Sequence, residues 1–427
     1  MTLTWVQIVR LGLVQMALGA IVVLTTSTLN RLMVVEFALP AILPGALVGL
    51  HYGIQLSRPR WGYTSDTGGN RTAWILGGMA ALAAGGFAAA FAVTLFATSF
   101  WAGLSLSVLA YAVIGLGVGA SGTSLLALLA TATAPERRAA AATITWLMMI
   151  FGIALTAGLA GSFLDPYSPA RLLVVVAVVV GAATLLSALA VAGIEKRVTA
   201  IAPEPAAPFL DGLREIWAEP RTRNFTLFVF LSMNAYFMQE LILEPFAGLV
   251  WGFSPGQSTA LSGAQNGGVF VGMLTVGIVA TGLRRGQLRS WVVAGCVGSA
   301  LALCVIAWEG VARAGLGLTG PVVALGFFNG MFAVAAIGSM MALAAEGRGQ
   351  REGTRMGLWG AAQAIAAGFG GLTGAAAVDV MRGLRPDTTA FGTVFLVEAA
   401  LFIAAAVMAL RIMDNTSSKH AAMVPGE

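Results

Sequence analysis

Acidic side chains occur inside long apolar runs of this sequence, where an ionisable group is costly and is therefore a candidate functional residue. Glu240 and Glu244 lie four residues apart, directly before Pro245, so a helix would place both carboxyls on one face. Two carboxylates that close cannot both ionise cheaply in a low dielectric, so either one carries a proton or a cation neutralises them. A solvated outer helix end is the alternative interpretation.

Further ionisable candidates lie nearer the start of the chain. Glu36 follows Asn30-Arg31 near the outer end of the second predicted span, so Arg31 and Glu36 could form a local ion pair or belong to a ligand site or gate. His51 is the only histidine within the apolar spans. A histidine at membrane depth either hydrogen-bonds to a neighbouring helix or ligates a metal or pigment.

A third group of candidates lies in the second half of the chain, within residues 356–364. Glycines at 357 and 360 clear space beside Trp359 and Gln363. The face formed by Trp359, Gly360 and Gln363 could therefore bind a large planar molecule. A helix-packing motif with an interfacial aromatic residue explains the pattern nearly as well.

The polar stretch from Arg58 to Arg71 separates two long apolar runs and reads Gly62-x3-Asp66-x2-Gly69-x-Arg71. The glycines allow close approach and a sharp reversal, the aspartate can lie against the positive end of a helix, and the arginine can clamp carboxylates or carbonyls. This spacing resembles the loop signature between helices 2 and 3 of the major facilitator superfamily of transporters. The resemblance implies that Gly62, Asp66, Gly69 and Arg71 form a gating latch, and an ordinary basic turn is the alternative.

The composition shows which elements must position these side chains. The 427 residues are 58% hydrophobic and only 10% charged, with a mean hydropathy of +0.86, so the chain is predicted to be an integral membrane protein. The 54 glycines indicate close helix packing in lipid, and spacings such as Gly268-x3-Gly272 are interpreted mainly as packing motifs. The net charge of +5 requires no nucleic-acid partner, since basic residues in membrane proteins usually set orientation.

At about 20 apolar residues per span, the sequence predicts an all-α fold with twelve transmembrane helices in two six-helix bundles, as in the major facilitator superfamily. The predicted spans lie near 6–28, 33–56, 72–97, 102–133, 139–163, 170–193, 224–251, 257–282, 289–310, 318–345, 353–380 and 388–411. The predicted domains are residues 1–194, an N-terminal bundle; 195–223, a cytoplasmic linker with an amphipathic helix; 224–412, a C-terminal bundle; and 413–427, a cytoplasmic tail.

Orientation follows from the basic residues. With both termini in the cytoplasm, 19 of the 24 lysines and arginines face inward and five, including Arg31, face outward. The positive-inside rule strongly favours this arrangement. No phosphate-cradling loop, zinc spacing or nucleophilic triad is visible, so the chain is not expected to be an enzyme.

Several stretches together are similar to the PucC/LhaA family, the bacteriochlorophyll delivery branch of the major facilitator superfamily. They are residues 29–36, Arg58 through Asp66, residues 239–246 and residues 356–364. The resemblance implies a carrier or assembly factor of a bacterial inner or photosynthetic membrane that binds bacteriochlorophyll or a late precursor as a ligand, with no intrinsic cofactor. It also implies light-harvesting or reaction-centre polypeptides, and the membrane pigment synthase, as partners. The loop 67–70 is shorter and more neutral than is usual in that family.

Two other functions remain open. The chain could be a secondary transporter of a small solute, with Glu36, Glu240 and Glu244 as coupling carboxylates, or a non-catalytic subunit of a pigment-synthesis enzyme. Within the first interpretation, Arg31, Glu36, His51, Glu240, Glu244, Trp359, Gly360 and Gln363 are the candidate pigment-binding or substrate-binding residues. His51 is the candidate ligand of the pigment magnesium.

Overall fold

A computed structural model describes residues 2–58, 70–134, 137–195, 217–282, 286–313, 315–346 and 352–413. The helices of the first half are α1 (Trp5–Val23), η1 (Leu24–Thr28), α2 (Leu29–Arg31), η2 (Leu32–Glu36), α3 (Ile42–Ile54), η3 (Gln55–Ser57), α5 (Arg71–Leu95), α6 (Phe100–Ala132), α7 (Arg138–Leu164) and α8 (Pro169–Val191). Those of the second half are α10 (Pro220–Met238), η6 (Gln239–Leu241), α11 (Leu243–Trp251), α12 (Pro255–Val276), η7 (Gly277–Gly282), α13 (Leu288–Ala312), α14 (Thr319–Glu346), α15 (Glu352–Arg382) and α16 (Asp387–Met413).

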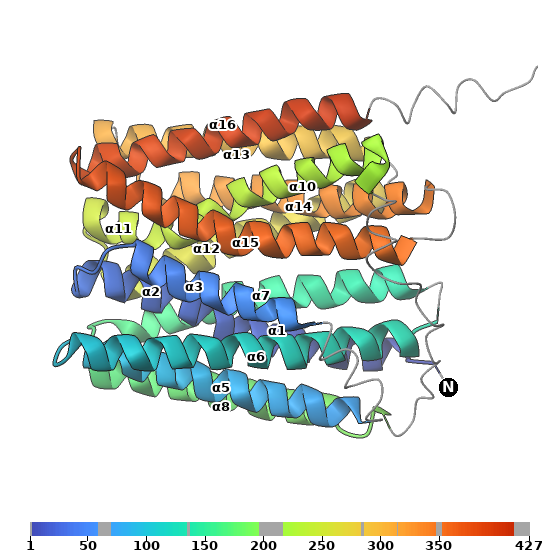
Figure 1. The fold of residues 1–427 in the computed structure, drawn as a ribbon, viewed down its shortest axis with the longest axis horizontal. Coiled ribbons are helices and arrows are strands. Elements are labelled where there is room, and N and C mark those ends of the chain that lie inside the picture. Colours follow the sequence, from blue (N-terminus) through green and yellow to red (C-terminus); the bar gives the residue numbers. More distant parts are fainter. Residues whose placement is uncertain are drawn as a thin grey trace, which may run out of the picture.

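These elements form twelve membrane spans in two six-helix bundles, as predicted (Figure 1). Eleven helical segments of the described chain are long and apolar enough to cross a membrane, and the shorter α3 with η3 makes the remaining span. The spans run roughly parallel, and the N-terminus and the end of α16 lie at the same end of the molecule (Figure 1). We call the opposite end, where α7 and α15 finish and α3 and α12 begin, the distal end.

The first span is longer than the sequence predicts. A single run of helix extends from Trp5 to Glu36, through two π-helical segments, and the chain breaks only at residues 37–41. The prediction that Arg31 lies in an outer loop and Glu36 on the second span is therefore wrong, because both belong to the first span. The break coincides with Pro40 and with the positive φ of 50° at Ala38, rather than with the charged residues.

Local sequence signals account for the start of several spans. Side chains at the N-cap accept a hydrogen bond from the first turn at Thr4, Asn70, Ser99, Ser168 and Ser254. These residue types are preferred because their oxygens satisfy backbone N–H groups that have no partner within the helix. Thr4 and Ser254 each form a full capping box with a glutamine three residues later.

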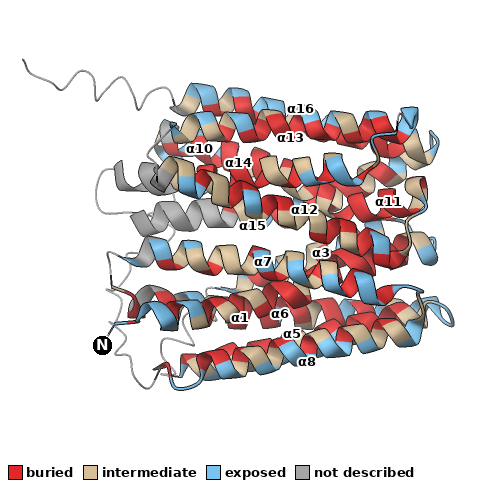
Figure 2. Cartoon of the chain, turned by 180° about the vertical axis from the view of Figure 1, so that it is seen from behind, coloured by how far each residue is buried: buried red, intermediate tan, exposed pale blue. Residues whose placement is uncertain are grey.

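Each bundle has its own apolar core, and the two cores touch. The first contains Leu11, Met79 and Ile114 together with Leu241 of the second half, and the second is built around phenylalanines and includes Ile150 of the first half. Buried residues concentrate on the faces between helices, whereas α8 presents exposed side chains outward (Figure 2). An exposed apolar face is what a lipid-facing helix requires.

Glycines bring α12 and α14 into close contact. A Cβ placed at Gly268 would lie 2.4 Å from the carbonyl oxygen of Val323, and one at Gly272 would lie 2.0 Å from that of Phe327. The prediction that the Gly268-x3-Gly272 spacing is a packing motif is therefore confirmed. In lipid, where no hydrophobic effect draws helices together, such backbone contact is a main source of association.

Candidate functional site

A row of polar side chains on the first span joins the two halves near the distal end. Ser27, Thr28, Asn30 and Arg31 each bond to a group of the second half, and each is nearly inaccessible. We call these four residues and their partners the interhalf seam. It lies on and between the π-helical segments Leu24–Thr28 and Leu32–Glu36, and such segments occur frequently at functional sites.

The bond made by Asn30 follows from a proline. Pro245 has no N–H, so the carbonyl of Leu241 loses the donor that an α-helix would supply four residues later. The Asn30 amide donates to that carbonyl at 2.7 Å and so satisfies it from the other half of the molecule. An unpaired carbonyl would be costly here because both residues are buried.

The same proline accounts for the arrangement of the two predicted carboxyls. A 3-10 turn, Gln239–Leu241, separates α10 from α11. The prediction that Glu240 and Glu244 share one face of a regular helix is therefore wrong. Glu244 is buried and Glu240 is half-buried. Thr26 of the first span lies within hydrogen-bonding reach of Glu240.

Glu244 is held by hydroxyl groups. The Ser27 hydroxyl donates to one carboxyl oxygen of Glu244 and also lies 2.9 Å from the Ser262 hydroxyl on α12. One turn of α12 away, the hydroxyls of Thr28 and Thr259 are 3.0 Å apart. The second Glu244 oxygen has no hydrogen-bond partner among the described residues. This arrangement could hold a proton or orient a polar ligand group.

Arg31 forms the distal part of the seam. Its guanidinium lies 2.5 Å from Glu36, so the local ion pair considered from the sequence is present, and it donates to the Phe253 carbonyl at 2.7 Å. The ion pair lies next to Tyr167 in the loop after α7. Burial raises the pKa of the Tyr167 phenol, and the negative charge of Glu36 acts in the same direction.

His51 is enclosed rather than open to a cavity. Its side chain is buried in α3, with Nε2 2.8 Å from the Gln55 amide nitrogen. An amide nitrogen can only donate, so Nε2 accepts and the proton is assigned to Nδ1, which has no hydrogen-bond partner among the residues that the structure describes. Ligation of a metal by Nε2 would require Gln55 to move aside.

Aromatic rings continue from His51 across to the second half. The Tyr52 ring lies 4.9 Å from that of His51 and 6.2 Å from that of Phe237, and the Tyr236 ring is 5.1 Å from Phe237. Tyr52, Tyr236 and Phe237 are half-buried. The two tyrosines lie close enough to half-buried Glu240 to interact with its charge. We call these three residues the aromatic group. It combines apolar faces with two phenol hydroxyls and a carboxyl, which is the chemistry needed for a ring with polar substituents.

The remaining candidates are only partly described. Gly62, Asp66 and Gly69 lie outside the described residues, and Trp359 and Gly360 belong to a stretch of α15 whose side chains are not described. Gln363 is half-buried on the same helix. Thus the structure brings Arg31 to Glu36 and brings Glu244 close to the first span.

Arg71 begins α5 and is buried. The N–H groups of Arg71 and Thr72 both donate to the Glu195 carboxylate, at 2.8 Å each. A carboxylate at a helix N-terminus is stabilised by the unpaired N–H groups and the helix dipole. Glu195, at the end of the first half, therefore fixes the start of the helix that carries Arg71.

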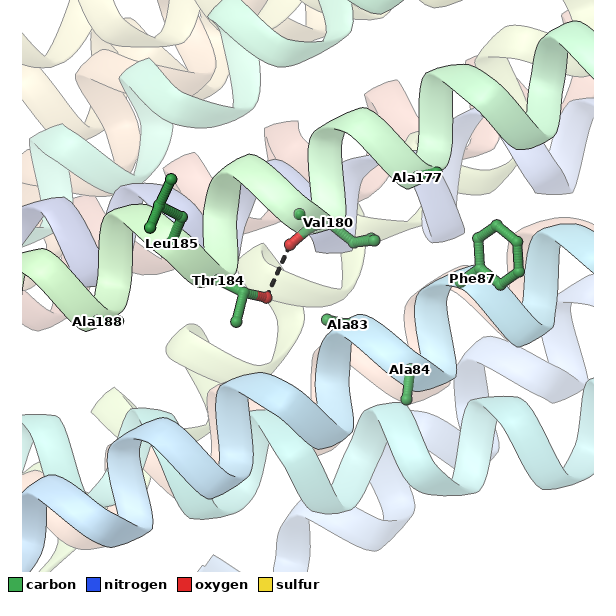
Figure 3. Close-up of a pocket in the computed structure, with 9 residues that line it drawn as sticks. Ala83, Ala84, Phe87, Ala177, Val180, Thr184, Leu185 and Ala188 are labelled. Carbon is green, nitrogen blue, oxygen red and sulfur yellow. Dashed lines mark hydrogen bonds between the residues drawn. The ribbon is translucent and has the colours of Figure 1, made fainter.

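A shallow apolar groove of about 620 Å³ lies between α5 and α8, on the outer side of the first bundle (Figure 3). Phe87 and Leu185 flank a floor of small residues. Its one hydroxyl, that of Thr184, donates to the Val180 carbonyl at 2.7 Å, so the groove offers no free polar group. It lies apart from the interhalf seam.

Sequence reasoning overlooked most partners in the seam. Ser27, Thr28 and Asn30 belong to the run Thr25-Thr26-Ser27-Thr28-Leu29-Asn30, whose density of hydroxyls inside an apolar span was a usable signal. Thr259 and Ser262 belong to a similar polar run, Gln257-Ser258-Thr259-Ala260-Leu261-Ser262, which was an equally usable signal. Neither run reveals which hydroxyls meet, because serines and threonines in membrane helices often bond to their own backbone instead.

Comparison with known proteins places these features in context. A family model described as PUCC protein matches residues 28–417. The chain is 65% identical over 426 residues to the "Bacteriochlorophyll synthase 44.5 kDa chain" of Rhodobacter capsulatus, covering 100% of this chain and 99% of the relative. It is 29% identical to "Protein PucC" of Cereibacter sphaeroides, covering 96% of this chain and 92% of that protein.

Solved structures resemble the fold. A mutant of the nucleoside transporter NupG superimposes with a TM-score of 0.69 at 14% identity, covering 96% of this chain and 99% of the transporter. A bacterial homologue of the human drug peptide transporters gives a TM-score of 0.68 at 13% identity, with 97% and 99% covered. At these identities the likeness establishes the fold alone.

Proposed function

Because the chain belongs to the PUCC protein family, we propose that it binds bacteriochlorophyll or a late precursor in a bacterial inner or photosynthetic membrane. It would deliver the pigment for assembly of light-harvesting or reaction-centre complexes. The observation that carries this proposal is the relative named as a bacteriochlorophyll synthase chain, 65% identical along 99% of its length. In this proposal the chain performs no chemistry itself and acts beside the membrane pigment synthase.

The aromatic group and Glu240 are the best-placed surface for the pigment. Tyr52 comes from the first half and Tyr236 and Phe237 from the second, so a ring held there would contact both halves. The phenol hydroxyls could donate to carbonyl substituents of the pigment, while the rings stack on its face. His51 lies directly behind Tyr52, and it would reach the pigment magnesium only after its bond to Gln55 opens.

The test is purification of the intact protein in mild detergent from a pigmented host, with absorbance and co-purifying proteins measured on monodisperse material. We expect a bacteriochlorophyll band in wild type and a lower pigment-to-protein ratio in Tyr52→Leu and Phe237→Leu. Phe100→Leu, at the exposed distal end, is the matched control and should retain the pigment. Pigment-free wild type, together with normal light-harvesting assembly in a strain lacking the protein, would refute the proposal.

Substitution of His51 separates its two possible roles. His51→Leu lowers the pigment-to-protein ratio of folded material if the imidazole ligates the magnesium. If His51 only supports α3 through Gln55, the variant lowers thermal stability and leaves the ratio unchanged. The second result would remove His51 from the pigment site without affecting the aromatic group.

A second candidate function, secondary transport of a small solute, is favoured by the position of Glu244. This buried carboxyl lies at the contact between the halves and is bonded by Ser27, so its protonation could be coupled to their movement. Solute uptake by purified protein in liposomes, lost in Glu244→Gln and unaffected by added pigment, would favour transport over delivery.

A further inference from the structure

The end of α7 contacts the start of α12 through one aspartate. The Asp165 carboxylate accepts from the Gly256 N–H at 3.1 Å and from the Ser254 hydroxyl at 2.5 Å. Ser254 is the N-cap of α12 and Gly256 lies in its first turn. Asp165 belongs to the first half and α12 to the second, so this contact joins the halves.

The end of α15 contacts the start of α3 in the same manner. The Asp379 carboxylate accepts from the N–H groups of Ala41 and Ile42 at 2.9 and 2.7 Å. These groups lie at the N-cap and first position of α3. Here the aspartate comes from the second half and the capped helix from the first.

The two contacts are equivalent under the division of the chain into two sets of six spans. α7 is the fifth span and α15 the eleventh, while α3 is the second and α12 the eighth. Each aspartate therefore lies at the end of the fifth span of its own half and caps the second span of the other half. Both contacts lie at the distal end, where α3 and α12 begin.

The helix pairs approach closely enough for these bonds to form. A Cβ on Gly256 would lie 2.5 Å from the Asp165 carboxyl carbon, and one on Gly161 would lie 2.6 Å from the Ala260 nitrogen. On the other side, a Cβ on Gly45 would lie 3.0 Å from that of Ala375. The caps therefore depend on direct contact of the two halves.

We propose that Asp165 and Asp379 form a paired latch that holds the two halves together at the distal end. Each carboxylate compensates unpaired N–H groups and the positive dipole of a helix in the opposite half. Both helix caps are lost when the two halves separate at the distal end. Neither contact involves the aromatic group, so the latch operates whether or not the pigment proposal holds.

The latch is tested by measuring the separation of the halves at the distal end. Spin labels at Thr98→Cys in the first half and Leu316→Cys in the second, both exposed, report that distance by pulsed electron resonance. The intact chain carries the labels in a background with Cys296→Ala and Cys304→Ala. We expect the double variant Asp165→Asn/Asp379→Asn to raise the population of longer distances about threefold or more, since each helix-end charge is worth a factor of about two to five.

The single variants should give smaller changes in the same direction. Asp387→Asn is the matched control, because this distal carboxylate bonds at 2.8 Å to Arg382 of its own half. Gly256→Ala supplies a second route that changes no charge, since its Cβ would lie 2.5 Å from both the Asp165 carboxylate and the Gly161 carbonyl oxygen and would force apart the same contact. Distance distributions of the double variant and of Gly256→Ala that superimpose on wild type would overturn the proposal, as would an equal shift in Asp387→Asn.

Discussion

At the scale of the residue, the hydrogen bond from the Asn30 amide to the Leu241 carbonyl joins a polar side chain of the first half to a backbone group of the second half that lacks its usual donor. Pro245 removes the donor for the Leu241 carbonyl, and Asn30 replaces it at 2.7 Å. The pairing could not be predicted, because the residues are 211 positions apart. The proline and the polar side chain are each visible in the sequence, but only the packing of the first span against η6 makes them partners.

This explanation predicts that Asn30 and Pro245 are energetically coupled. Asn30→Ala should lower the free energy of unfolding by about 1–3 kcal/mol, because the Leu241 carbonyl is left buried and unpaired. In a Pro245→Ala background the same change should cost less, since residue 245 can then donate to Leu241 itself. A double-mutant cycle on thermal unfolding in detergent measures the coupling, and equal costs in both backgrounds would contradict the explanation.

A second prediction concerns the hydroxyl that supports Glu244. Ser27→Ala should destabilise the protein by about 1–3 kcal/mol, because a buried carboxyl loses its donor. Ser105→Ala is the control: that exposed serine bonds to the Ala102 carbonyl of its own helix, and its loss should change stability by less than about 0.5 kcal/mol. The unfolding midpoints of the two variants are the measurement, and equal shifts would show that the Ser27 bond contributes nothing specific.

At the scale of the element, the twelve spans were predictable because each requires about 20 apolar residues, but the boundary between the first two was not. A charged residue in an apolar run usually marks a loop, and this places Arg31 outside the membrane. Arg31 is instead inside a helix that extends to Glu36, because the second half supplies Phe253 and the first half supplies Glu36 to satisfy its charge. The break lies at Pro40, in residues that hydropathy does not distinguish from the spans.

Contacts between helices lead to a prediction on α12. Gly272→Ala should disrupt the contact with α14, because its Cβ would lie 2.0 Å from the Phe327 carbonyl oxygen. Gly267→Ala, on the same helix, has no atom within 4 Å of the new Cβ and should be neutral or stabilise the helix by up to about 1 kcal/mol. Thermal unfolding of the two variants decides the matter, and equal destabilisation would mean that the loss at Gly272 reflects glycine itself rather than the helix contact.

At the scale of the whole molecule, two six-span halves meet along contacts that belong to neither half alone. The interhalf seam uses residues of the first span against the segment from η6 to α12, whereas Asp165 and Asp379 cap helices reciprocally. The sequence indicated two halves of six spans each. It did not indicate the reciprocal caps, because an aspartate at the end of a span has no visible partner until the other half is in place.

The final prediction concerns which end of the molecule faces the cytoplasm. The N-terminus and the end of α16 share one end (Figure 1), and the basic residues assigned to that end number 19 of 24. With Arg31 placed inside the first span, only four basic residues remain in the distal loops and at the helix ends beside them, so the bias is stronger than the sequence alone suggested. In a background with Cys296→Ala and Cys304→Ala, an impermeant thiol reagent added outside cells whose outer membrane has been made permeable should therefore label Thr98→Cys at the distal end. It should not label Ala218→Cys at the start of the second half until the inner membrane is opened. The reverse labelling pattern would show that the chain has the opposite orientation in the membrane.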